Sequence, residues 1–146
     1  MFQDVELSEG VIPEDVTEVE ISKCRELKIQ SGAFNGGKLL KRVRVIEINS
    51  LVVNKQAFQN ITSPNPFMEI FEINKVTLKR HAFKNTKGPL SIKIHKCNEV
   101  TIMPNTFSWL LDLTIKDVPN LTLASNALKL LRTQNGRHGP APRVNY

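Results

Sequence analysis

Two cysteines and three histidines are the first side chains of this 146-residue chain to consider for nucleophilic or metal chemistry. Cys97 follows His95 by two residues, and a nearby imidazole can activate a thiol. A reactive thiol also needs solvent exposure and a lowered pKa, whereas the apolar pattern described below directs Cys97 into the interior. The three histidines, His81, His95 and His138, are too scattered to form a metal site of known spacing. We therefore expect no catalytic residue, no metal ligand and no cofactor.

Paired carboxylates are the second kind of chemistry to weigh, because two acids on one surface can hydrolyse a glycosidic bond. Asp112 and Asp117 are the only aspartates after residue 15, and the middle glutamates are interleaved with bases, as Glu47, Glu69 and Glu72 show. This scatter indicates that the chain is not an enzyme. A polysaccharide-acting β-solenoid enzyme is kept as a distant alternative.

The elements that would position these side chains come from an internal repeat. A small residue followed by a large apolar one recurs at steps of 24, 25, 24 and 21 residues, in the pairs Ala33-Phe34, Ala57-Phe58, Ala82-Phe83, Thr106-Phe107 and Ala127-Leu128. When this pair occupies positions 15 and 16 of a unit, positions 1, 3, 6, 9, 11 and 16 are apolar in all five units. The units then begin at Val19, Val43, Met68, Ile92 and Leu113.

The spacing within a unit predicts two strands. Positions 1 and 3 alternate with polar neighbours, as does the pair at 9 and 11, which is the pattern of strands with one buried face. One unit cannot bury its apolar side alone, but five stacked units can. We therefore predict a mainly β repeat solenoid of five units of about 24 residues, with parallel sheets and little helix. Residues 1–18 would form an N-terminal cap or lead-in, 19–128 the solenoid, and 129–146 a basic, disordered tail.

The unit from Ile92 to Phe107 resembles the animal extracellular type of leucine-rich repeat, and less closely the bacterial surface type. It has a strand, Cys97 at the interior position that this family fills with Asn or Cys, and the Thr106-Phe107 ending. Residues 11–21 are similar to the end of an N-terminal capping module, and the resemblance covers 11–128. It departs in having two residues between the interior position and the next apolar one. The resemblance implies a non-catalytic recognition module that binds a protein partner through its concave, first-strand sheet.

The outward positions of that sheet supply candidate contacts. Ile46 and Phe71 are apolar where the alternation calls for polar residues, and they fall on adjacent strands. Charged residues surround them, and an apolar centre within a charged rim is typical of protein-binding hot spots. The alternative is that both side chains pack across strands or belong to the core. The predicted partner-binding residues are Arg44, Ile46, Phe67, Glu69, Phe71, Lys93 and His95.

The two cysteines share position 6, three repeats apart. Strands in one sheet are about 4.8 Å apart, which separates their Cα atoms by roughly 14 Å. A disulfide needs a separation below about 7 Å. We therefore predict two separate buried thiols that act as small apolar core residues.

Two glycosylation sequons, Asn60-Ile61-Thr62 and Asn120-Leu121-Thr122, fall at outward, turn-like positions. They favour an extracellular or cell-surface location, although the first residues lack the apolar segment of a signal peptide. We therefore expect the chain to be a fragment of a larger surface protein. The alternative is a structural or adhesive repeat segment of such a protein.

The net charge of +6 is concentrated in the middle of the chain and could attract anionic polymers. No recognition helix, zinc spacing or aromatic platform accompanies it, so we expect no nucleic-acid partner. No stretch approaches the roughly 20 apolar residues of a membrane helix, so we expect no membrane insertion by this segment. The identity of the protein partner and the oligomeric state are not indicated.

Overall fold

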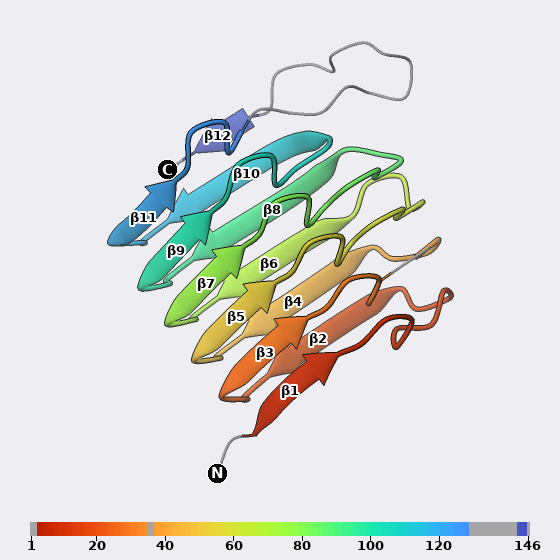
Figure 1. Ribbon diagram of the computed structural model, residues 1–146, viewed down its shortest axis with the longest axis horizontal. Helices are drawn as coiled ribbons and strands as arrows, with labels where there is room; N and C mark the ends of the chain where they lie inside the picture. The colour runs from red at the N-terminus through yellow and green to blue at the C-terminus, as the bar shows by residue number, and fades with distance from the viewer. Residues whose placement is uncertain (1–2, 35–36, 129–142, 146) are drawn as a thin grey trace.

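The computed structural model describes residues 3–34, 37–128 and 143–145, and these build two parallel sheets of six strands each (Figure 1). The first-strand sheet contains, in spatial order, β2 (Glu18–Ser22), β4 (Arg42–Ile46), β6 (Phe67–Phe71), β8 (Leu90–His95), β10 (Leu110–Lys116) and β12 (Arg143–Asn145). The second-strand sheet contains β1 (Asp4–Leu7), β3 (Glu26–Ile29), β5 (Ser50–Val53), β7 (Lys75–Leu78), β9 (Glu99–Ile102) and β11 (Asn120–Leu123).

The chain alternates between these sheets, so each turn adds one strand to both of them. The result is a β-solenoid of about five turns, which confirms the predicted fold class. None of the described residues lies in a helix, and accordingly none of them forms a helix that could cross a membrane.

Residues with a left-handed backbone mark the same two places in successive turns. Between the first and second strands they are Lys23, Glu47, Glu72, Lys96 and Asp117, with φ between 54° and 57°. After the second strand they are Gly32, Gln56, His81, Asn105 and Asn126. The ladder of hydrogen bonds continues through the second set, because the N–H of each of the first four residues donates to the carbonyl of the equivalent residue in the next turn, at 2.9–3.1 Å. The turns therefore stack as regularly as the strands.

The six apolar columns predicted from the sequence line the space between the sheets. All of their members are buried except six at the ends of the stack, which are half-buried: Val19, Ile21, Val118, Leu121, Leu123 and Leu128. An end turn has a neighbour on one side only, so its apolar side chains keep part of their exposure.

A stack of phenylalanines runs through this core beside the second left-handed turn. The ring centroids of Phe34 and Phe58 are 4.5 Å apart, those of Phe58 and Phe83 are 4.9 Å apart, and those of Phe83 and Phe107 are 5.5 Å apart. The planes differ by only 14–21°, because the parallel ladder places equivalent side chains directly above one another. Four consecutive turns are thus joined by side-chain contacts as well as by hydrogen bonds.

Strands outside the five predicted units extend both sheets. In residues 1–18, the expected N-terminal cap, β1 pairs with β3 and adds a sixth strand to the second-strand sheet. In the expected disordered tail, residues 129–142 lie outside the described residues, but Arg143–Asn145 pair with β10. These three residues therefore form a paired strand at the end of the first-strand sheet. The edge of β10 offers unpaired backbone groups, and Val144 packs against the core.

The Phe stack generates a stability prediction. Phe58→Ala should lower the free energy of unfolding by about 3–5 kcal/mol, because the ring is 4% exposed and contacts a ring on each side. Leu39→Ala is the control, since Leu39 is 52% exposed, and it should change stability by less than about 0.5 kcal/mol. Urea unfolding followed by circular dichroism measures both. Equal losses in the two variants would contradict the stacking argument.

Candidate functional site

The predicted partner-binding residues lie on three neighbouring strands of the first-strand sheet. The strand register aligns Arg44 of β4 with Glu69 of β6 and Lys93 of β8, which gives a charged row across the sheet. A second row, two residues further along each strand, contains Ile46, Phe71 and His95. Both rows point away from the core.

Glu69 is the centre of the charged row. Its carboxylate accepts a 2.9 Å hydrogen bond from Arg44 Nε, and its other oxygen lies 2.8 Å from His95 Nε2. Arg44 also donates from Nη1 to Glu20 of β2, at 3.2 Å. Four strands are therefore linked by one chain of ion pairs, which holds these side chains in fixed positions.

The electrostatics keep Glu69 ionised. Partial burial is the largest influence and by itself raises the pKa of Glu69, but the hydrogen bonds and charges of Arg44 and His95 outweigh it, and the pKa lies below its ordinary value. The hydrogen bond to Glu69 likewise raises the pKa of the Arg44 guanidinium. Glu69 and Arg44 are therefore both charged at neutral pH.

Phe71 is the aromatic side chain of the site. Its half-buried ring lies 4.4 Å from the His95 ring, centroid to centroid, with the planes tilted by 31°. Lys96 Nζ lies 5.8 Å from the centroid of the Phe71 ring, within the range of a cation–π contact. The Phe71 ring thus contacts both an imidazole and an ammonium group, and it remains only half-buried.

Ile46 contributes less surface than expected. Its exposed fraction is 9%, because it lies between Ser22 and Phe71 on the neighbouring strands. The alternative of cross-strand packing therefore describes Ile46 correctly. Lys93 is half-buried beside Glu69 in the charged row.

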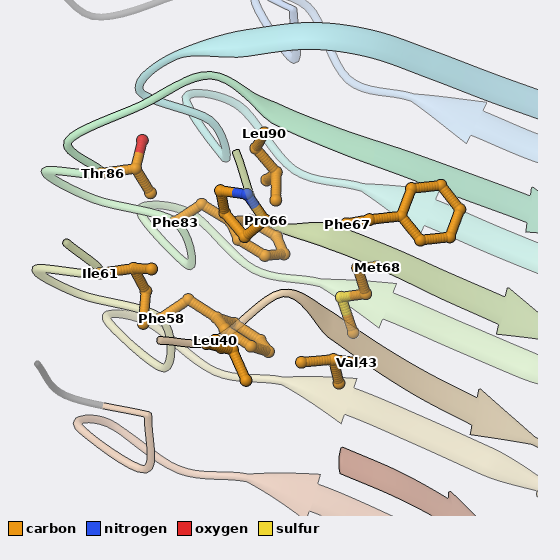
Figure 2. A pocket seen from close by; sticks show the side chains of 10 residues that line it. All are labelled: Leu40, Val43, Phe58, Ile61, Pro66, Phe67, Met68, Phe83, Thr86 and Leu90. Atoms are coloured by element: carbon orange, nitrogen blue, oxygen red, sulfur yellow. The ribbon is translucent and has the colours of Figure 1, made fainter. Parts of the chain in front are cut away.

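Phe67 lies at the other end of β6, about 13 Å from Phe71 along the strand. It borders a small apolar cavity of about 10 Å³ (Figure 2). Figure 2 shows its ring extending away from the core rings of Phe58 and Phe83. The cavity is at the lower limit for one water molecule, so it is a packing gap and not a ligand pocket.

Both cysteines are buried and unpaired, as predicted. Burial raises the pKa of both thiols. The Cys97 Sγ lies 3.5 Å from the His95 carbonyl oxygen, whereas the His95 ring lies on the outer face against Glu69 and Phe71. The left-handed residue Lys96 separates the two and turns their side chains to opposite sides. A thiol–imidazole pair therefore does not form here.

Two contributors to the site were absent from the predicted set. Glu20 completes the row of ion pairs on β2, and Lys96 reaches over Phe71 from the turn. Glu20 could have been found from its position opposite Arg44 in the repeat. Lys96 could not, because its direction depends on the left-handed backbone at that residue.

Within the described part of the chain, no group of three or more His, Cys, Asp or Glu side chains is arranged to hold a metal ion. Comparisons of the chain with protein-family models, curated proteins and solved structures gave no match. The arrangement of the strands alone defines the class of the protein, which is a β-solenoid.

The charged row generates a pH prediction. Glu69→Gln should cost about 1–2 kcal/mol of unfolding free energy at pH 7, because it removes a carboxylate that accepts two charge-assisted hydrogen bonds. Since the pKa of Glu69 is lowered by folding, the wild-type advantage is present above the ordinary glutamate range and is lost as pH falls through the folded value.

Urea unfolding at pH 7 and at successively more acidic pH measures this difference. The control is Glu72→Gln, which alters an exposed glutamate in the turn after the same strand. A cost for Glu69→Gln that stays constant down to the most acidic pH would show that the carboxylate does not stabilise the fold through its charge.

Proposed function

We propose that this β-solenoid is a non-catalytic recognition module that binds a protein partner through its first-strand sheet, as a segment of an extracellular or cell-surface protein. The observation that carries the proposal is the Phe71 ring, which is partly exposed beside a row of fixed charges. An aromatic anchor surrounded by polar groups is the usual composition of a binding hot spot.

Preorganisation supports this function. Arg44, Glu69 and His95 are already held by hydrogen bonds in the free chain. A partner would not have to order these side chains, which lowers the entropic cost of association. The rows continue along the sheet through Thr114 and Lys116 of β10, so the surface offered to a partner is wider than the three central strands.

A structural or adhesive role is the second candidate. Among the described residues, β2 and β1 end the two sheets on one side, and β12 and β11 end them on the other. Such edge strands carry unpaired backbone groups that can pair with another chain. In this case the stack itself would be the functional feature, and Phe71 would be dispensable.

Cell binding separates the two candidates. Fluorescent tetramers of the chain should stain at least one animal cell line, and trypsin treatment of the cells should remove the staining. Phe71→Glu should weaken the staining at least tenfold, since it places a charge in the apolar centre of the site. Val52→Glu is the matched control, because Val52 is a half-buried outward residue of β5 on the opposite sheet.

Flow cytometry measures the apparent affinity, and circular dichroism verifies that both variants are folded. Recognition through the first-strand sheet predicts loss of binding in Phe71→Glu alone. Equal staining by the wild type and both variants would support the adhesive alternative.

The extracellular location has its own test. The chain, expressed behind a signal peptide in animal cells, should be secreted with glycans on Asn120 and Asn60. Asn120 is exposed at the start of β11, and Asn60 is half-buried in a turn. Deglycosidase shifts of the single Asn→Gln variants count the glycans, and labelling of the denatured protein should find two free thiols. Retention inside the cell with neither sequon modified would contradict this location.

A further inference from the structure

The turns that follow the second strands carry a group of cations that the proposed function does not use. Lys55, Lys79, Arg80 and Lys84, here called the basic turn cluster, come from the turns that follow β5 and β7. These turns lie side by side (Figure 1), and Gln56 N–H donates to the His81 carbonyl at 2.9 Å between them. The cluster thus brings together residues that are up to 29 positions apart.

The charges of the cluster are not neutralised within the chain. Among the described residues, no Asp or Glu carboxylate lies within salt-bridge distance of these four side chains. Lys55, Lys79 and Arg80 are exposed, and Lys84 is half-exposed. Four cations on adjacent turns, without acidic partners, raise the local positive potential, and a positive potential attracts anions.

His81 lies among these cations, and its pKa is lowered by burial and by their charges. Burial first, and then the charges of Lys84, Lys55 and Arg80, lower the pKa of His81. His81 is therefore neutral at pH 7, and the positive charge of the cluster resides on the lysines and the arginine. The buried Nδ1 of His81 has no hydrogen-bond partner among the described residues.

A polar trough leads away from the cluster along the same sheet. It is an open depression of about 560 Å³ across β3, β5 and β7, and Lys79 belongs to both the trough and the cluster. Its lining includes the amides of Gln30 and Asn54, which are joined by a 3.0 Å hydrogen bond, and the hydroxyl of Thr77. Amides and hydroxyls arranged in rows suit a ligand that is rich in hydroxyl groups.

The chemistry of the trough separates the classes of polyanion. Nucleic acid in single-stranded form is held by aromatic side chains on which its bases stack, and no aromatic residue lines the trough. Lys55 and Arg80 occupy equivalent positions in adjacent turns, whose backbones are about 4.8 Å apart along the stack. A polysaccharide with one carboxylate per disaccharide would leave such closely spaced cations unpaired, whereas a densely sulfated one would not.

We propose that the basic turn cluster and the polar trough together bind a linear, densely sulfated polysaccharide, with sulfates on the cluster and sugar hydroxyls along the trough. This site lies on the sheet opposite Phe71 and is independent of the proposed protein-binding face. Both surfaces could be occupied at once, since each faces away from the shared core.

The chain offers a closely matched pair of variants for the test. Lys79-Arg80 is a consecutive Lys–Arg pair within the site, and Lys41-Arg42 is an exposed Lys–Arg pair at the start of β4, on the other sheet. Both double alanine variants remove the same charge. A labelled heparin decasaccharide is the probe, and its affinity is measured by fluorescence anisotropy from 50 to 300 mM NaCl.

We expect Lys79→Ala/Arg80→Ala to weaken binding at least tenfold at 150 mM NaCl and to flatten its salt dependence, because binding then releases fewer counterions from the polysaccharide. Lys41→Ala/Arg42→Ala should change affinity less than twofold. A second site variant, Lys55→Gln/Lys84→Gln, should repeat the loss, and Phe71→Glu should leave heparin binding unchanged even if protein binding fails.

Three outcomes would overturn the proposal. Equal weakening by the two Lys–Arg variants would show that net charge alone attracts the probe. An oligonucleotide of equal charge that binds as tightly as heparin would show that the site does not distinguish a sugar chain. Unsulfated hyaluronan that binds as tightly would remove the requirement for sulfates.

Discussion

The parallel ladder between successive turns is the constraint on which the other features depend. Each strand pairs with the equivalent strand one turn away, and the pairing keeps equivalent residues opposite one another from β2 to β10. Because of this register, a residue type that recurs once per turn becomes a column in space. The apolar columns form the core, the phenylalanines form a stack, and the outward residues form rows of charge.

The same constraint gives the two outer faces separate characters. On the first-strand sheet, acids and bases alternate from turn to turn, so Glu20, Arg44 and Glu69 neutralise one another and are held in place. In the turns that follow β5 and β7, Lys55 and Arg80 occupy equivalent positions, and neither forms an ion pair among the described residues. The charged row is therefore ordered internally, and the basic turn cluster is left to attract a partner of opposite charge.

Much of the architecture could be predicted from the sequence, because the buried residues of a repeat recur at the same positions in every unit. The apolar columns and the small residue–Phe pairs located the strands, and the sheets follow from stacking them. The shared column of Cys24 and Cys97 similarly gave two separated thiols.

The parts that could not be predicted depend on contacts that do not recur from one repeat to the next. β12 pairs with β10 across a long connection, and nothing in the 129–146 composition indicates a partner strand. Ile46 is covered by its neighbours although its position faces outward. The repeat register correctly places His95 outside and Cys97 inside, but Lys96, as a residue type, does not indicate the left-handed backbone that separates them.

The position of β1 and β12 at opposite ends of the stack has a mechanical consequence (Figure 1). Tension applied between the two ends pulls along the direction of the interstrand hydrogen bonds and loads the terminal turn first. Each turn is held only by its neighbours, so turns would detach one after another instead of yielding together. A released turn of 24 residues contributes roughly 80 Å of extended chain. If the chain tethers two bodies, the solenoid would act as an extensible spacer that lengthens in steps.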